Sequence, residues 1–237
     1  MKKKKSMGEV IIMTEVIEEI REGNIVGRLV YDPEPDNPRE WDNLGRMVCF
    51  HKRYKLGDEH DLKPEMFNSW EELEEYLIKN EDAVVILPLY LFDHSALFMN
   101  TTGFRHLGWY GAFDSGQVGY IYATREAIKK EYGVKRISKK LKRKVEEVLL
   151  GEVETYDKFL RGEVYGYEIV RLNKCPYCGH VEEEYLDGCY GYYDEGYARE
   201  EMSRMVKIYA EKEEKCTNRG DYICNIGYAC DGCPHRE

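Results

Sequence analysis

Apolar residues along the chain follow two spacings, one typical of strands and one of helices. Alternation of β-branched or apolar with polar positions predicts strands at 9–20, 26–31, 46–53, 117–123 and 164–172, the first of which could instead hold a short helix. Residues 83–92 are almost continuously apolar, which predicts a strand covered on both faces.

Helical spacing appears in three segments. Ser69 followed by Glu72 forms a capping box, which predicts a helix that begins at residue 70. Residues 138–160 carry apolar side chains at three- and four-residue steps, which predicts a helix that Gly151 could divide into two. Residues 195–212 predict a last helix.

Together these elements predict an α+β fold, with a mixed or antiparallel sheet, flanking helices and a small cysteine-rich metal-binding module at the C-terminus. The expected domains are an α+β core at 1–172 and the module at 173–237. The proline-rich stretch at 32–38 breaks regular structure and is expected to be a surface loop.

Composition narrows the cellular setting. No apolar run approaches the roughly 20 residues that span a bilayer. The lysine-rich start of the chain is not followed by the apolar segment of a signal peptide. We therefore expect a cytoplasmic protein, in the host cell if the origin is viral, with no membrane partner.

Charge is distributed unevenly along the chain. The net charge of −10 disfavours phosphate binding by the whole surface, yet residues 129–144 hold nine Lys or Arg and one Glu. This basic stretch predicts contact with nucleic-acid phosphates or an acidic protein partner, and its alternative is a solvated helix face. The candidate binding residues are Lys139, Lys140, Lys142, Arg143 and Lys144.

Eight cysteines in a reducing compartment favour metal binding or reactive thiols over disulfides. Seven of them lie near the C-terminus, at Cys175, Cys178, Cys189, Cys216, Cys224, Cys230 and Cys233. Cys175-Pro-Tyr-Cys178-Gly has the form of a zinc knuckle, and the last four cysteines span 18 residues, enough for a complete tetrahedral set. One or two structural Zn²⁺ ions are therefore predicted.

Three groupings of these cysteines remain open. The first places Cys175 and Cys178 with Cys189 and a fourth ligand such as His180, and gives the tail its own ion. The second joins the two CxxC pairs as in a zinc ribbon, across a 51-residue separation. The third is an iron–sulfur cluster in the tail, because four thiolates serve either metal. Free thiols and a redox-active CxxC are the alternatives to metal binding.

A second set of polar residues in the first domain could form an acid–base or metal site if the fold brings them together. Its members are His51, Asp58, His60, His94 and Asp114. Cys49, near His51, is a candidate nucleophile, and the alternative for all of them is an ordinary hydrogen-bonding role.

Long strings of the chain resemble a family of uncharacterised proteins encoded by bacteriophages. They include Asp36-Asn-Pro-Arg-Glu-Trp-Asp-Asn-Leu-Gly45, Leu87-Pro-Leu-Tyr-Leu-Phe-Asp-His94, Asp114-Ser-Gly-Gln-Val-Gly-Tyr-Ile-Tyr122, Gly162-Glu-Val-Tyr-Gly-Tyr167 and Asp187-Gly-Cys-Tyr-Gly-Tyr192. The resemblance covers about 26–193 and implies a viral or prophage origin but no reaction. The extension past residue 195 departs from the family pattern.

The resulting functional prediction is a non-enzymatic, zinc-stabilised accessory protein of phage type. It would bind a host protein or nucleic acid, for example to counter a defence system. The alternative is a hydrolase that uses the His/Asp set. An acidic decoy of nucleic acid is a third hypothesis, which 35 Lys and Arg residues make a poor fit.

Overall fold

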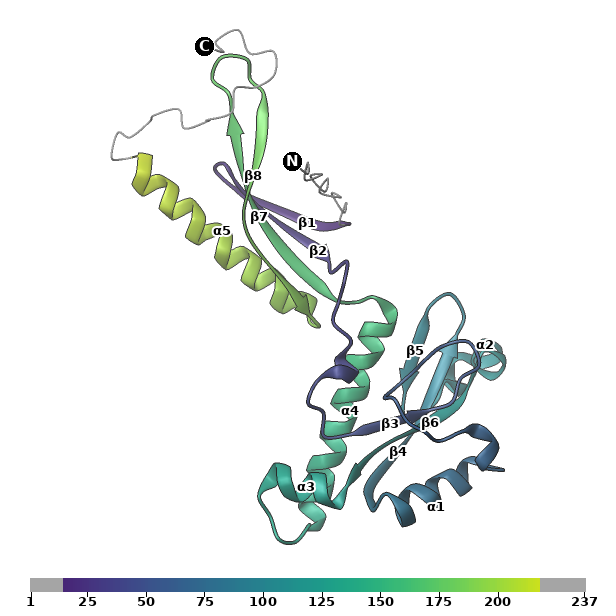
Figure 1. Ribbon diagram of the computed structural model, residues 1–237. Coiled ribbons are helices and arrows are strands. Elements are labelled where there is room, and N and C mark those ends of the chain that lie inside the picture. The colour runs from purple at the N-terminus through teal and green to yellow at the C-terminus, as the bar shows by residue number, and fades with distance from the viewer. Residues whose placement is uncertain (1–14, 218–237) are drawn as a thin grey trace, which may run out of the picture. The chain divides into compact units, whose positions relative to one another are not determined.

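The computed structural model describes residues 15–217, which form two compact units (Figure 1). One unit combines 15–35 with 164–217, and the other comprises 36–163, so the second is inserted in the sequence of the first. Each contains an antiparallel sheet, packed against one helix in the first unit and several in the second, which confirms the α+β class. The expected boundary at 172/173 lies inside strand β7 (Tyr165–Lys174).

The first unit is a four-stranded sheet with one long helix. The sheet order is β1-β2-β7-β8, where the strands are β1 (Val16–Glu22), β2 (Ile25–Tyr31), β7 (Tyr165–Lys174) and β8 (Val181–Tyr192). Helix α5 (Glu195–Thr217) lies along this sheet. Ile25, Leu29 and Ile169 from the strands pack against Met202 and Val206 of the helix.

Gly27 allows α5 to lie close to the sheet. A Cβ atom at this position would lie 2.5 Å from Val206 Cγ2 and 2.9 Å from Met202 Cγ, both nearer than real Cβ contacts. The glycine shares its strand face with Ile25 and Leu29, because side chains two residues apart point the same way. Its missing side chain thus sets how closely helix and sheet approach.

The second unit is built on a sheet of order β3-β6-β4-β5. Its strands are β3 (Arg46–Cys49), β4 (Ala83–Asp93), β5 (Leu97–Asn100) and β6 (Ser115–Thr124). Its helices are α1 (Trp70–Asn80), α2 (Gly108–Phe113), α3 (Arg125–Tyr132) and α4 (Lys139–Arg161), with short 3-10 turns at Pro38–Glu40, Pro64–Met66 and Arg105–Leu107.

Two hydrophobic clusters cover the two faces of this sheet. In one, Leu89 and Ile121 pack with Val145 and Leu149 of α4. In the other, Tyr122 packs with Leu73 and Leu77 of α1. The apolar run at 83–92 accordingly forms β4, a strand with helices on either side.

Several predicted element boundaries differ from the structure. Helix α4 runs unbroken through Gly151, because the apolar stripe on both sides of the glycine packs on one sheet. Half of the predicted capping box of α1 is present, since Ser69 Oγ accepts from the Glu72 amide. The other half differs: Glu72 Oε2 accepts from the amide of Asn68, where the box predicts the amide of Ser69. Strands β5 and β8 were not predicted, since β5 has four residues and β8 is rich in acidic side chains.

Two sequence predictions are limited by the range that the structure describes. Cys224, Cys230 and Cys233 lie outside the described residues, so the expected cysteine-rich module is described only as far as Thr217. Within 15–217, no helix is both long enough and apolar enough to cross a membrane.

Candidate functional sites

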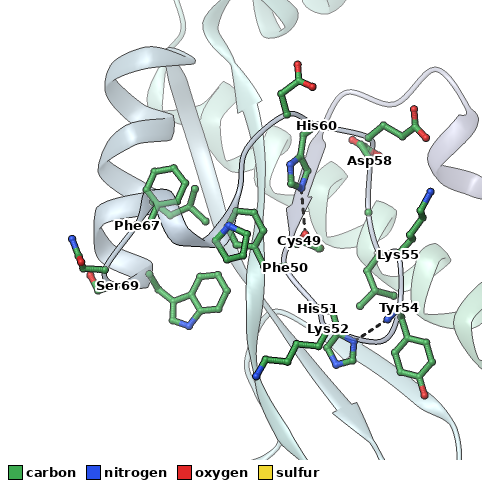
Figure 2. Close-up of a pocket in the computed structure, with 18 of the residues that line it drawn as sticks. Cys49, Phe50, His51, Lys52, Tyr54, Lys55, Asp58, His60, Phe67 and Ser69 are labelled. Atoms are coloured by element: carbon green, nitrogen blue, oxygen red, sulfur yellow. Dashed lines mark hydrogen bonds between the residues drawn. The ribbon is translucent and has the colours of Figure 1, made fainter.

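A cleft of about 1070 Å³ lies in the second unit, between the segment that follows β3 and the start of α1 (Figure 2). Three of the predicted site residues, His51, Asp58 and His60, line it together with Cys49. His94 and Asp114 are not among its lining residues and form a separate pair. The fold therefore divides the predicted His/Asp set into two groups.

The cleft wall is shaped by a turn at Gly57 that returns the chain to β3. Gly57 has φ +72° and forms a β-bridge with Val48, while the Asp58 amide donates to Met47 O at 3.0 Å. A Cβ at Gly57 would lie 2.9 Å from Met47 O, so the turn requires glycine for both its φ angle and its space. The Gly57 amide also donates to the Tyr156 hydroxyl of α4 at 3.0 Å.

Asp58 is held by Arg39, a residue that no sequence pattern marked as part of a site. Arg39 is buried, with 2% of its side chain exposed, and donates to Asp58, to Glu152 of α4 and to Gly45 O. Asp58 also accepts from the Met47 amide at 2.8 Å. Its carboxylate is therefore occupied by structural hydrogen bonds and is a poor general base.

The two histidines of the cleft have their tautomers set by backbone partners. His51 Nδ1 accepts from the amides of Arg53 and Tyr54, at 3.3 and 3.2 Å, so its hydrogen must lie on Nε2. His60 Nε2 lies 3.2 Å from Cys49 O, which can only accept, so His60 also carries its hydrogen on Nε2. His51 thus lacks a lone pair for catalysis or metal binding, whereas His60 keeps one on Nδ1.

Cys49 is chemically unsuited to be the nucleophile of this cleft. Burial raises the pKa of its thiol to about 12, and the negative charge of Asp58 contributes in the same direction. Because the thiolate is the nucleophilic form, a thiol with so high a pKa is almost wholly unreactive at neutral pH.

His94 and Asp114 form a hydrogen-bonded pair at the end of β4. The distance from His94 Nδ1 to Asp114 Oδ2 is 3.1 Å, and the Asp93 amide donates to Asp114 O at 2.9 Å, which joins the two segments. Both side chains are substantially exposed, at 56% and 36%. A carboxylate that orients an imidazole is a common catalytic and metal-binding device, but here the pair faces solvent.

The basic stretch forms an exposed surface on α3, the start of α4 and the loop between them. We call this surface the basic face. Its residues are Lys129, Lys130, Lys135, Arg136, Lys139, Lys140, Lys142, Arg143 and Lys144. Eight of these nine residues, including all five predicted binding residues, are exposed. Lys144 lies over the ring of Tyr132, with Nζ 4.9 Å from its centroid.

The cysteine knuckle occupies the tip of the β7–β8 hairpin. The Cys175 amide donates to His180 O at 2.8 Å, the Gly179 amide donates to Cys175 O at 3.0 Å, and Gly179 has φ +73°. This tight turn carries Cys175, which is buried, and Cys178, which is exposed. The segment from Cys175 to His180 is thus a tight turn that joins β7 to β8.

Cys189 lies too far along the hairpin to share an ion with the knuckle. It pairs with Tyr167, whereas the last pair before the tip is Lys174 with Val181. The seven residues from Tyr167 to Lys174 correspond to about 23 Å of strand. Two sulfurs on one zinc lie at most about 4.6 Å apart, so the grouping of Cys189 with Cys175 and Cys178 does not fit the fold.

No group of three or more His, Cys, Asp or Glu side chains is placed to hold a metal ion in the part of the chain that the structure describes. Cys216 lies in the last turn of α5, and the other three tail cysteines follow it in the sequence beyond Thr217.

Comparison with known proteins gives no relative for this chain: no family model matches it, and neither a curated protein nor a solved structure is detectably similar to it. The resemblance to phage-encoded proteins therefore stays a prediction, and the function has to be inferred from the sites themselves.

Proposed function

We propose that this protein is a non-enzymatic binding protein that contacts nucleic-acid phosphates through its basic face. The observation that carries the proposal is that nine cations gather within residues 129–144 and that none of them forms an ion pair with another described residue. Positive charge gathered without internal partners is typical of a phosphate-binding surface.

The position of these cations on α4 supports an external anionic partner. The first turn of α4 contains no acidic residue and carries Lys139, Lys140 and Lys142, close to the N-cap Ser138. A helix N-terminus bears partial positive charge, so each cation there is unfavourable by about 0.3–1 kcal/mol. A bound phosphate would relieve this repulsion, because it would accept from both the side chains and the helix end.

The hydrolase alternative receives less support from the geometry. Asp58 is occupied by Arg39, and the lone pair of His51 Nδ1 accepts two amides. His94 and Asp114 pair outside the cleft. Neither the cleft nor the His94–Asp114 pair combines an available base with an activated nucleophile.

Zinc is the ion that we assign to the knuckle, with two tail cysteines completing a four-thiolate site, in accord with the zinc-ribbon grouping. Helix α5 runs toward the hairpin tip. Near its start, Arg199 donates to Glu18 of β1. Near its end, Glu213 accepts from Asn24 and from Arg171, and Arg171 lies on β7 three residues before the end of that strand at Lys174. The 13 residues from Thr217 to Cys230 can span up to about 43 Å, which is ample to reach the tip. Such an ion would be structural, since four thiolates leave no open position.

The phage-type origin and a role against host defence are part of the same proposal, and rest on the sequence resemblance alone. A host protein, in place of nucleic acid, is the second candidate partner of the basic face. It would be detected by affinity capture from bacterial lysate, using the wild type and a basic-face variant as baits.

Nucleic-acid binding is tested by fluorescence anisotropy with labelled single-stranded and duplex DNA and RNA over a range of salt concentrations. The variant replaces Lys139, Lys140, Lys142, Arg143 and Lys144 with Gln. The control replaces five exposed lysines elsewhere, Lys52, Lys63, Lys79, Lys207 and Lys212, so that net charge changes equally.

We expect the basic-face variant to lose binding and the control to retain it. For a duplex, the loss of five phosphate contacts would make the negative slope of log K against log salt shallower by up to about 4.5. Equal binding by the two variants, or no binding by the wild type at low salt, would refute the proposal.

A further inference from the structure

One wall of the cleft in the second unit is aromatic. The ring centroid of Phe50 lies 6.2 Å from that of Trp70 and 6.3 Å from that of Phe67, with interplanar angles of 21° and 29° (Figure 2). All three rings line the cleft and are only partly buried. The face of an aromatic ring carries the negative part of its quadrupole, so such a wall attracts cations.

Carboxylates without ionic partners also surround this cleft. Glu59, Asp61 and Glu71 line it, and none of them forms an ion pair with a described basic side chain, although Lys52 and Lys55 line the same cleft. Hydrogen bonds from its own backbone amide and from Ser69 lower the pKa of Glu71, so this group stays ionised at neutral pH. The two lysines are exposed and can keep their ammonium groups in water.

A third feature of the cleft is an acceptor that lacks a donor. Nε2 of His60 donates to Cys49 O, which leaves Nδ1 with a lone pair. This atom is buried and has no hydrogen-bond partner in the described chain. A buried polar atom without a partner is costly, so a ligand that displaces the atoms covering Nδ1 and donates to it would gain that free energy.

Aromatic faces, carboxylates and a lone-pair nitrogen all favour the same kind of ligand, a cation that only donates hydrogen bonds. We propose that this cleft binds an arginine side chain of a partner polypeptide. The guanidinium stacks on aromatic rings and offers five donors in one plane, whereas a lysine ammonium is compact and strongly hydrated. A volume of about 1070 Å³ accommodates the side chain with its flanking backbone.

The cleft and the basic face share no residue. The lining residues of the cleft fall between Cys49 and Leu73, whereas the basic face begins at Lys129. The two sites also favour opposite charges. Variants of one site are therefore expected to leave binding at the other unchanged, so that the failure of either proposal can be told from the failure of the other.

The test uses a blocked Gly-Arg-Gly peptide and its citrulline counterpart, which has nearly the same shape but no charge. Trp41 and Trp109 are replaced by Phe in the full-length chain, so that Trp70 is the sole indole reporter. We expect a saturable change in Trp70 fluorescence with the arginine peptide. Binding of the citrulline peptide should be weaker by roughly tenfold or more, because hydrogen bonds to a charged group are the stronger kind.

Variants then locate the site. Phe67→Leu should weaken arginine binding roughly 2- to 30-fold, and Asp61→Asn with Glu71→Gln should weaken it by up to roughly 5-fold for each residue. Glu65→Gln is the matched control, because Glu65 is exposed and lies outside the cleft lining. Urea unfolding of each variant separates lost binding from lost folding.

Three outcomes would overturn the proposal. One is equal binding of the arginine and citrulline peptides. Another is no binding of the arginine peptide by fluorescence and calorimetry at millimolar concentration. The last is tighter binding of a neutral nucleoside than of the arginine peptide, which would make the cleft a base-binding site.

Discussion

The guanidinium of Arg39 donates from Nε and Nη2 to the two carboxylate oxygens of Asp58, at 2.8 and 3.0 Å. Its remaining terminal nitrogen donates to Glu152 of α4 at 3.1 Å. One buried arginine thus joins the loop before β3, the cleft wall and the long helix. Burial by itself would lower the pKa of Arg39, but the hydrogen bonds and charges of the two carboxylates outweigh it and raise that pKa.

Replacing Arg39 with Met should therefore be strongly destabilising. It would leave Asp58 and Glu152 without their cation, and breaking a buried ion pair by removing one partner costs about 3–5 kcal/mol. Urea unfolding measures the loss. Arg125→Met is the control: Arg125 pairs with Asp82 on the surface, where such a pair contributes at most about 1 kcal/mol. Similar losses in the two variants would contradict a special role for Arg39.

Two glycine substitutions should have opposite effects on stability. Gly27→Ala places a methyl group against Val206 and Met202, so we expect a cost of about 1–3 kcal/mol as α5 is pushed from the sheet. Gly151 lies inside α4 with nothing within 4 Å of its would-be Cβ, so Gly151→Ala should stabilise by up to about 1 kcal/mol. Thermal unfolding of both variants checks the predicted signs.

Asp157 should make stability fall as pH rises. Burial raises the pKa of this carboxyl, although the Met99 amide and Arg161 act in the opposite direction. With a folded pKa above the unfolded one, the folded state holds the proton more tightly. The resulting stabilisation is present below the unfolded pKa and is lost as pH rises through the folded pKa.

The comparison for this carboxyl is Asp157→Asn, which keeps an acceptor for the Met99 amide and does not titrate. We expect the unfolding free energy of the wild type, relative to the variant, to decrease as the pH is raised from acid to neutral. Denaturant titrations at a series of pH values measure this difference. A difference that is constant or rises with pH would contradict the prediction.

Metal content should depend on Cys178 and not on Cys189. Cys178→Ser removes a ligand at the hairpin tip and should abolish one bound zinc per chain, whereas Cys189→Ser should leave it in place. Elemental analysis of the two purified variants is decisive, since both substitutions remove one exposed thiol. A brown protein that contains iron and absorbs visible light would show that the bound group is an iron–sulfur cluster and not zinc. Equal loss of metal in both variants would reject the proposed grouping of cysteines.

The thiols of Cys49 and Cys178 should differ greatly in their reaction with iodoacetamide. The Cys49 pKa of about 12 leaves almost no thiolate at pH 8, and the side chain is buried. Cys178 is exposed and should react readily once chelator has removed any metal. Mass spectrometry of the folded chain should therefore show early labelling at Cys178, and labelling at Cys49 only after denaturation.

The sequence alone determined most of the regular elements, because they depend on local patterns. The apolar stripe at 138–160 predicted the helical character of α4 but not its continuity, and Ser69 with Glu72 predicted the start of α1. The tight turn at Cys175 and Cys178 was predictable from the local sequence, because its hydrogen bonds close within a few residues. The exposure of the basic stretch followed from charge, since uncompensated lysines remain in water.

Only the tertiary structure decided which distant residues meet. It gave Asp58 a buried arginine 19 positions away and placed Cys189 about 23 Å along the hairpin from the tip. It also showed α4 to be continuous, since packing on the sheet outweighs the weak helix propensity of Gly151. Local patterns specify elements, whereas register and the pairing of buried charges arise from contacts between elements.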